Sequence, residues 1–327
     1  MARGSTRRRT GAAGLCRGVR VPRHLGALYS GGGAVSPFHY GGQALLEGVM
    51  IRGRSHMVAA VRAPSGEIVY HEEELPPAAR SLARWPFLRG LYALWDTLWL
   101  GVRALTFSAN VSVGDPQGQI GTGGMVGVLV LALLFGVGLF FVLPLLLSRL
   151  VEPLVVAPWA RTLLEGAIRL GILLLYLVLI GQLRDLRRVF AYHGAEHKAV
   201  NAYEAGAALE VEAIRPFSTA HARCGTAFLL LVVVLCVLVF APFGALPFGL
   251  RLLSRVLLVP VVAALAYETM RLGARHADRP LVRTLLAPAL FLQRLTTRPP
   301  DDPMLEVALS ALRRAIELDA AEGSLRP

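Results

Sequence analysis

Charged residues and cysteines are both scarce in this chain of 327 residues. Only 17% of the residues are charged whereas 54% are hydrophobic, and the mean hydropathy of +0.54 is too high for an ordinary soluble domain. The three cysteines, Cys16, Cys224 and Cys236, lie in a basic leader, a polar segment and an apolar run, which implies no disulfide framework. The composition therefore indicates a multi-span membrane protein.

Acidic residues are absent from the first part of the chain, where no Asp or Glu precedes Glu47 and arginines are frequent. The same part has no apolar core of about 7 to 15 residues, which excludes a secretory signal peptide. We predict that residues 1–39 form a disordered basic arm of a bacterial protein. An organelle transit peptide is the alternative, and it would place the protein in an organelle membrane.

Motifs of several common enzyme classes are also missing. The chain has no internal repeat, no dinucleotide-binding glycine fingerprint and no serine nucleophile elbow. The stretch GGQALLEGVMIRGR at 41–54 is rich in glycine, but no lysine follows it as in a P-loop, so it is weak as a phosphate motif. The net charge of +12 does not indicate nucleic acid, because the arginines are spread without aromatic residues between them. We attribute this surplus to membrane topology and to contact with anionic lipids.

Four apolar segments are each long enough to cross a membrane, because about 20 helical residues span a hydrocarbon core of roughly 30 Å. We predict an all-α polytopic membrane protein with about four transmembrane helices. The third and fourth are separated by little more than Pro247, Phe248 and Gly249, so they form a tight hairpin or a re-entrant pair. The predicted spans are residues 124–147, 163–183, 226–246 and 252–270.

Lysine and arginine are concentrated before the first predicted span, between the second and the third, and after the fourth. In a four-span protein these three parts lie on one side, and the positive-inside rule places them in the cytoplasm. We therefore predict a multi-pass protein of the bacterial cytoplasmic membrane with both termini in the cytoplasm. The polar segment 184–225 shares that compartment.

Short elements are predicted outside the spans. Residues 57–63 and 67–70 look extended and flank a Pro-Ser-Gly turn, which predicts a small N-terminal β-hairpin. A helix that starts at Pro86 has apolar residues at steps of three and four, interrupted by charges, which favours an interfacial helix at the headgroup level. Packing of this helix against the protein's own spans is the alternative.

The end of the chain carries a helix start signal. Asp302 and Pro303 predict a cap and a first-turn proline, and apolar residues follow on one stripe. We expect a short amphipathic cytoplasmic helix here, followed by a tail of residues 319–327.

Two histidines have the spacing that one metal ion requires. His193 and His197 are four residues apart, so on a helix both imidazoles project from one face about one turn apart. Glu196 completes the pattern H-x-x-E-H, the inverse of the zinc-protease signature, and is the candidate general base. Glu204 continues the same helical face and is a candidate oxygen ligand.

A second pair of potential ligands comes just before the third predicted span. His221 and Cys224 are three residues apart, which lets both reach one ion from a single turn, and Cys with His is a favoured zinc set. If the polar segment folds back on itself, these two residues join His193 and His197 in one site. A closed set of four such ligands would be structural, whereas catalysis requires an open position.

Each of these residues also has a purely structural interpretation. A histidine or glutamate at a membrane boundary often bonds only to backbone carbonyls, and Cys224 would serve as a small buried residue at a helix start. Glu165 and Arg169, four apart within the second span, are expected to pair. Glu47 and Glu268 are further candidates as ligand or proton acceptor, although an ordinary salt bridge to arginine explains them equally well.

Five blocks of the sequence resemble a known family when they are taken in order. They are YGGQALLEGVMIRG, FAYHGAEHKAVNAYE, HARCGTAFL, AYETMRL and LTTRPPDDPMLEVALSAL. Together they resemble the bacterial membrane family designated domain of unknown function 1385 (DUF1385), whose members are often labelled predicted metal-dependent enzymes. The resemblance runs from about residue 40 to 318 and implies a membrane domain over that range. It implies a metal-dependent activity without an established reaction.

Three functions remain open from the sequence. The leading hypothesis is an enzyme, most simply a hydrolase, that uses a divalent metal such as zinc at the cytoplasm-facing His/Glu/Cys site. The alternative is a non-enzymatic membrane scaffold or assembly factor whose polar segment is structural and binds a cytoplasmic protein. A transporter is the third, and it requires a homo-oligomer because four spans with few charges give a monomer a poor path.

Overall fold

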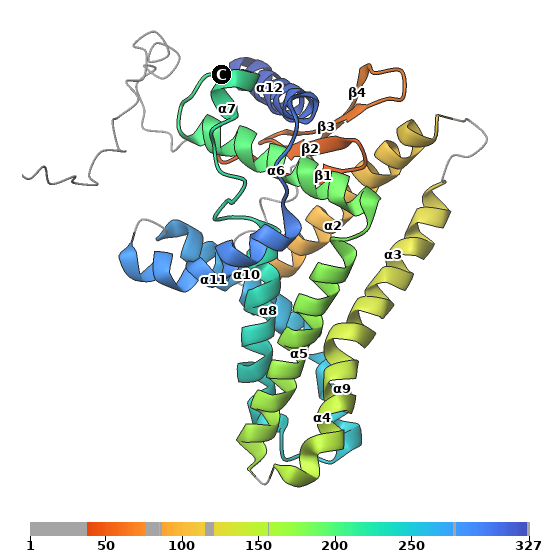
Figure 1. The fold of residues 1–327 in the computed structure, drawn as a ribbon, viewed down its shortest axis with the longest axis vertical. Coiled ribbons are helices and arrows are strands. Elements are labelled where there is room, and N and C mark those ends of the chain that lie inside the picture. Colours follow the sequence, from red (N-terminus) through yellow and green to blue (C-terminus); the bar gives the residue numbers. More distant parts are fainter. Residues whose placement is uncertain are drawn as a thin grey trace, which may run out of the picture. The chain divides into compact units, whose positions relative to one another are not determined.

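The computed structural model describes residues 38–75, 85, 87–114, 121–155, 157–276 and 279–325. The predicted basic arm of residues 1–39 lies almost entirely outside these ranges, as do Cys16 and Pro86. Within the described residues, helices predominate and a single antiparallel sheet is formed near the start (Figure 1).

The sheet is a four-stranded meander in sequence order. Its strands are β1 (Gly41–Leu45), β2 (Gly48–Arg52), β3 (His56–Arg62) and β4 (Ile68–Glu74). The β3–β4 pair confirms the hairpin predicted around the Pro-Ser-Gly turn. The stretch GGQALLEGVMIRGR, which we considered only as a weak phosphate motif, forms the β1–β2 hairpin, with Leu45 paired to Gly48 across a two-residue turn. Gly48 fits because a Cβ there would lie 2.4 Å from the Ala60 carbonyl oxygen.

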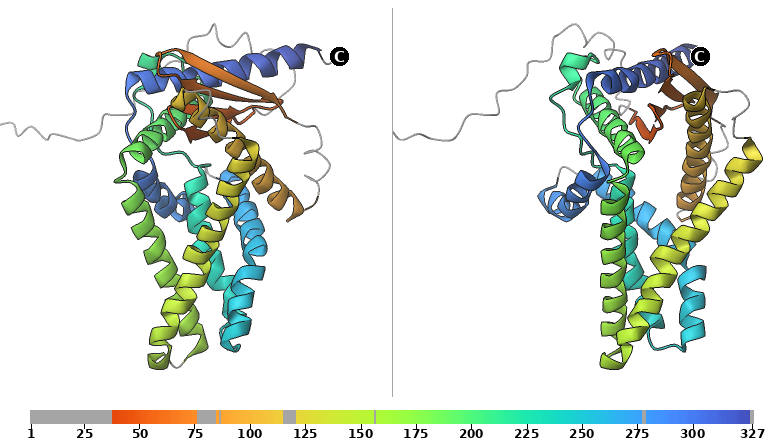
Figure 2. Two further views of the ribbon diagram at one scale, coloured as in Figure 1. Left: turned by 90° about the vertical axis from the view of Figure 1, so that its right-hand side faces the viewer. Right: turned by 45° about the vertical axis from the view of Figure 1, so that its right-hand side comes forward.

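Both faces of the sheet are covered, which explains why its central strands are almost continuously apolar. Along β3, Val58 and Ala60 face a core shared with helices α6 (Arg184–Glu204) and α12 (Asp302–Leu325). Met57, Ala59 and Val61 face the opposite core, which includes Leu100 and Ala104 of α2 (Leu88–Val113). Figure 2 shows α12 and α6 on one side of the sheet and α2 on the other.

Two helices predicted from the sequence are therefore part of this layered core. Helix α2 forms where the sequence predicted an interfacial helix. It packs on the sheet and on α10 (Val259–Arg275), part of a candidate span, as the alternative prediction had it, and Trp95 is 59% exposed. Helix α12 spans 24 residues, longer than the short helix we predicted. Its cap is Asp301, whose Oδ1 accepts a hydrogen bond from the Met304 backbone N–H at 3.0 Å, so the cap lies one residue before the predicted Asp302.

The remaining helices are strongly apolar and lead away from the sheet (Figure 1). Three helical stretches are long and apolar enough to cross a membrane, Gly123–Leu154, Trp159–Ile180 and Gly225–Phe243. A fourth is present if the pair Phe248–Leu257 and Val259–Gly273, bent by 47°, counts as one span. The four predicted segments thus correspond to three candidate spans and one bent pair of helices. The elements are α3 (Thr122–Val137), π-helix η3 (Gly138–Val142), α4 (Leu143–Val151), η4 (Glu152–Leu154), α5 (Pro158–Ile180), α8 (Gly225–Phe240), η5 (Ala241–Phe243) and α9 (Phe248–Leu257).

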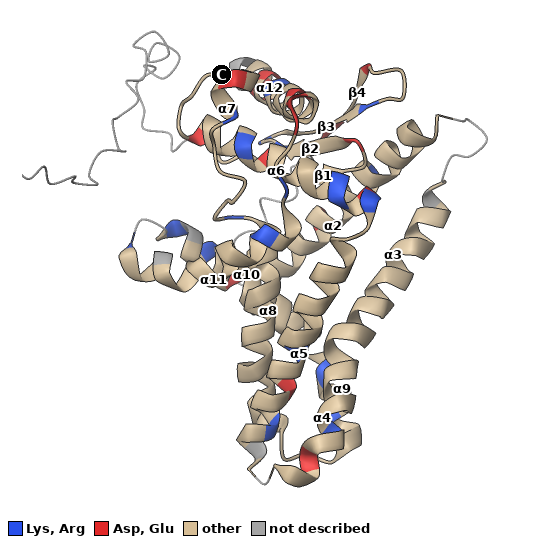
Figure 3. Ribbon diagram, viewed as in Figure 1, with Lys and Arg blue, Asp and Glu red and all other residues tan. Residues whose placement is uncertain are grey.

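Charged residues are few along these apolar helices (Figure 3), and three of them form a buried cluster. Glu165 accepts hydrogen bonds from Arg169 at 2.7 Å, as predicted, and also from Arg255 on α9 at 2.6 Å. Arg169 donates its Nε to the Phe140 carbonyl of the π-helix at 2.8 Å. All three charged side chains are at most 4% exposed, so the cluster ties α5 to α9 and to η3.

Two helices were not predicted. The short α7 (Val211–Ile214) lies in the polar segment that follows α6, and α11 (Pro280–Thr296) precedes α12. Helix α11 packs on α8 and lies crosswise to it at the end nearest the sheet (Figures 1 and 2). It matters for the candidate site because its last turn reaches the histidines of α6.

Candidate metal centre

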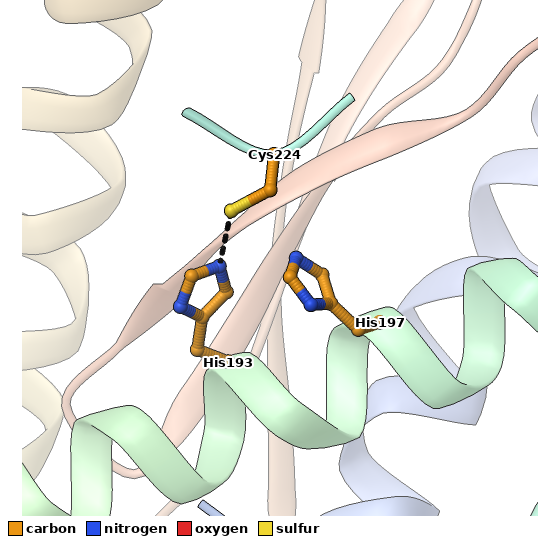
Figure 4. A group of neighbouring side chains, drawn as sticks. All are labelled: His193, His197 and Cys224. Atoms are coloured by element: carbon orange, nitrogen blue, oxygen red, sulfur yellow. Dashed lines mark hydrogen bonds between the residues drawn. The ribbon is translucent and has the colours of Figure 1, made fainter. Parts of the chain in front are cut away.

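Three potential ligand atoms converge where α6 meets the start of α8. His193 and His197 lie one turn apart on α6, and Cys224 is the N-cap residue of α8. One ligand atom from each residue lies within 4.8 Å of the other two (Figure 4). The Cys224 Sγ is 3.3 Å from the His193 Nε2, and the two imidazole centroids are 4.4 Å apart. Ligand atoms at these distances can reach one ion.

The orientation of both imidazoles is fixed by backbone carbonyls. His193 Nδ1 lies 2.8 Å from the Thr296 oxygen, and His197 Nδ1 lies 2.6 Å from the Thr219 oxygen. A carbonyl oxygen only accepts, so each Nδ1 carries a proton, and in the neutral form of either imidazole the lone pair is on Nε2. Metal-binding histidines are commonly held in this way by the nitrogen that does not bind the ion.

Helix α6 also holds the loop that delivers Cys224. Lys198 donates to the carbonyls of Arg215 and Phe217 at 2.6 and 2.5 Å. Asn201 donates from Nδ2 to two further carbonyls of the same loop, at 2.9 and 3.1 Å. Because these donors and His197 project from one helix, a single rigid element positions both halves of the site.

Helix α11 fixes the same loop from the other side. The fully buried Gln293 accepts the His221 backbone N–H and donates to the His221 carbonyl, both at 2.9 Å. The linker after α11 touches α6 closely, and a Cβ on Gly194 would lie 2.1 Å from the Arg298 carbonyl oxygen. Sequence reasoning missed Gln293, which belongs to no ligand motif, and Gly194, which fills an unspecified position of H-x-x-E-H.

Glu196 lies beside the three ligands and is buried. One of its oxygens is 3.5 Å from His197 Nε2, and the Gly42 backbone amide hydrogen-bonds to it. Burial raises the pKa of the Glu196 carboxyl, against the lowering influence of His193 and of the Gly42 amide. A Cβ on Gly42 would lie 3.1 Å from the Glu196 Cγ, so the glycine permits the strand to approach.

The other two predicted ligands, His221 and Glu204, lie together at the edge of this group. His221 Nε2 is 3.4 Å from Glu204 Oε2, and the same carboxylate pairs with Arg223 and lies 3.7 Å from His39. The His221 ring is 5.7 Å from that of His197. Burial lowers the pKa of His221 and keeps the imidazole neutral. Among the described residues, the convergent ligand atoms are those of His193, His197 and Cys224.

Glu47 and Glu268 are engaged elsewhere. Glu47 makes a bidentate pair with Arg188, at 2.5 Å for each bond. The Arg188 guanidinium is the main reason that the pKa of Glu47 is lowered. Glu268 pairs with Arg89 in the same bidentate manner at 2.6 and 2.5 Å. Both carboxylates thus form the salt bridges to arginine that we gave as the alternative to a role as ligand or proton acceptor.

A cavity of about 470 Å³ adjoins the three ligands and Glu196. Part of its wall comes from elements that sequence reasoning did not connect to the histidines. These wall residues include His39, Arg52, Ala93, Thr97 and Tyr267. The glycines of β1 and Arg52 belong to the block YGGQALLEGVMIRG, so their place in one block was the only signal that could have identified them.

Comparison with known proteins gives two matches. The family model described as "Protein of unknown function (DUF1385)" matches residues 85–318, a range that contains the three ligands and Glu196. A protein of Bacillus subtilis (strain 168) called "Uncharacterized protein YqhQ" is 34% identical over 301 residues, which cover 87% of this chain and 94% of that protein. No solved structure matches.

Proposed function

This chain belongs to the DUF1385 family, and we propose that it is a membrane protein that binds a divalent metal at a cytoplasm-facing His/Cys centre and catalyses hydrolysis there. The observation that carries the proposal is the convergence of His193, His197 and Cys224 within 4.8 Å. Both imidazoles are oriented for the task, because each Nδ1 is held by a carbonyl.

The donor set favours zinc over harder ions. Two imidazole nitrogens and one sulfur suit zinc, whereas calcium and magnesium prefer oxygen ligands. Three protein ligands beside a cavity are typical of catalytic zinc sites, which keep one position open. In such a site the ion supplies Lewis acidity toward water and the substrate.

Glu196 is the residue we assign to proton transfer. It lines the cavity, adjoins His197 and is shielded from bulk water. A carboxyl group in this place can take a proton from an attacking water and return it to a leaving group. Gly42 holds the carboxyl in position through its backbone amide.

The placement at the cytoplasmic membrane surface is supported by the order of the elements. Cys224 immediately precedes the apolar helix α8, and the polar helix α6 follows the apolar α5 after a short break. The site therefore adjoins the ends of two candidate spans. The bias of arginine and lysine toward the same end favours the cytoplasm over the outside.

Metal analysis of the purified protein in detergent tests this proposal. We expect about one zinc per chain in the wild type and none in His193→Ala, His197→Ala or Cys224→Ala. His276→Ala is the matched control, because that imidazole bonds to the Leu272 carbonyl of its own helix. A wild type without stoichiometric metal, or ligand variants that retain it, would disprove the metal centre.

A scaffold is the second candidate, and the hydrogen bonds of the polar loop favour it. Lys198, Asn201 and Gln293 hold the loop through the protein alone. Glu196→Gln separates the two functions, because it preserves shape and removes the proton acceptor. We expect this variant to keep its fold and metal and to fail complementation in cells. Full complementation would favour the scaffold.

A further inference from the structure

Two arginines line the same cavity as the three ligands, and they come from separate elements. Arg52 is the last residue of β2, and Arg223 directly precedes Cys224. Glu196 is the one carboxyl group among the described lining residues, and it is only 5% exposed. The exposed charged groups of the described wall are therefore the two guanidiniums.

Each arginine pairs with one carboxylate, which leaves some of its guanidinium N–H donors for a ligand. Arg52 pairs with Asp96, and Arg223 pairs with Glu204. Neither partner is among the described residues that line the cavity. A guanidinium has five N–H donors in a planar fork, and one carboxylate occupies at most two of them. The side chains of Arg52 and Arg223 are 34% and 30% exposed, so a ligand in the cavity can reach them.

From this arrangement we propose that the cavity binds the phosphate group of the substrate, gripped by Arg52 and Arg223 beside the three ligands. A carboxylate is satisfied by one guanidinium fork, whereas a tetrahedral phosphate has enough oxygens for two. The role of the phosphate in hydrolysis rests on the function proposed above, but its binding by the arginines does not. Arg52 and Arg223 are then substrate-positioning residues.

The same chemistry occurs in a lipid headgroup and in a soluble phosphate ester. The wall includes Gly225, the first residue of α8, and Ala93 and Thr97 of α2. Helix α8 is a candidate membrane span, so its first residue marks the end of that span next to the cavity. A headgroup beside this end is thus within reach of the cavity, and the experiment compares both sources.

Binding measurements with two probes test the proposal. Inorganic phosphate is titrated calorimetrically into zinc-treated protein in detergent, and phosphatidic acid is presented in phosphatidylcholine nanodiscs. The variant Arg52→Gln/Asp96→Asn removes both members of one ion pair, so no charge is left without its partner. Arg62→Gln is the matched control, because Arg62 ends the neighbouring strand β3 and pairs with Glu306 instead. Metal content is measured on each sample.

We expect saturable binding of at least one probe, weakened about tenfold or more in the double variant and unchanged in Arg62→Gln. Loss of phosphatidic acid binding identifies a lipid source, and loss confined to inorganic phosphate identifies a soluble one. The proposal is overturned if neither probe binds the wild type, or if the double variant binds as tightly. Arg52-dependent binding by a protein that holds no metal would support the anion site while contradicting the metal centre.

Discussion

The layered part around the sheet and the long apolar helices differ in what lies at their centres and in what they expose. At the centre of the first lie Val49, Ile51 and Leu312, all fully buried. At the centre of the second lie Arg169 and Arg255 on either side of Glu165, while leucines such as Leu131 are 69% exposed. Both parts belong to one chain, and we attribute the difference in where charged side chains lie to the medium that surrounds each part.

A charged side chain is costly in an apolar environment unless it is paired. It therefore lies either on the outside or in the interior of a structure, depending on which of the two is polar. Around the sheet the polar side is the outside, as in water-soluble proteins. In the apolar helices the polar side is the interior, which is the pattern expected of helices surrounded by hydrocarbon. The candidate metal centre lies where the two patterns meet, at the first turn of α8.

The largest effect should come from removing the buried charge that the apolar helices share. Glu165→Ala leaves two guanidiniums without a counter-charge, and we expect a loss of about 3 to 5 kcal/mol of stability. Glu72→Ala is the counterpart in the layered part, where the exposed pair with Arg314 contributes roughly 0 to 1 kcal/mol. Thermal unfolding in detergent measures both. If both variants lost the same stability, buried and exposed charges would not differ in the way proposed for the two parts.

A smaller effect is expected where the two parts touch. Gly194→Ala places a methyl group against the Arg298 carbonyl, which displaces the linker that orients His193. We expect a loss of about 1 to 3 kcal/mol and weaker zinc retention against a chelator. Gly136→Ala on α3 is the control, since nothing lies within 4 Å of its added Cβ. Unchanged zinc retention in Gly194→Ala would show that the linker does not orient the ligand.

Loss of the amide that holds the loop should weaken both the fold and the binding of metal. Gln293→Leu leaves the buried His221 N–H and carbonyl without partners, at a cost of about 1 to 3 kcal/mol. Supporting residues of this kind typically change metal affinity by about 10 to 100-fold. A zinc competition assay measures the change. If Gln293→Leu bound zinc as tightly as the wild type, Gln293 would contribute to packing and not to the metal site.

The smallest effect concerns acid sensitivity of the layered part. Asp319 is partly buried, which opposes ionisation, but bonds from Arg54, Ser55 and Tyr40 prevail and lower its pKa. A lowered pKa in the folded state stabilises the protein above the unfolded value of about 3.9. This contribution declines as the pH falls through the folded pKa. Asp319→Asn should be less stable than the wild type at pH 7 by about 1 kcal/mol. Its free energy of unfolding should also fall less than that of the wild type on acidification, as measured by denaturant unfolding at both pH values.

Local patterns predicted the parts of the fold that depend on them. Hydrophobic length gave the apolar helices, and the four-residue spacing placed His193 and His197 on one face of α6. Spacing alone does not bring a residue into a site, however. Glu204 continues that face, but seven residues of helix advance about 10 Å beyond His197, and its carboxylate lies against Arg223.

The features that sequence reasoning missed depend on contacts between distant segments. The sequence of β1 and β2 resembles a glycine-rich loop. Its hairpin structure is recognisable only from the pairing of β2 with β3. Gln293 has no motif, and it becomes recognisable only when α11 packs against the loop before α8. Such contacts are specified by three-dimensional packing, which a periodic pattern does not record.

The bond from His193 to the Thr296 carbonyl also sets an order of events during synthesis. His193 is made 103 residues before the group that orients it, and His221 is made 72 residues before Gln293. The apolar helices α8, α9 and α10 are synthesised in between. A ribosome-bound chain that ends before α11 therefore carries His193, His197 and Cys224 but lacks the carbonyl that orients His193 and the amide that holds the loop before Cys224. Loading of the proposed metal would then be one of the last steps of biogenesis.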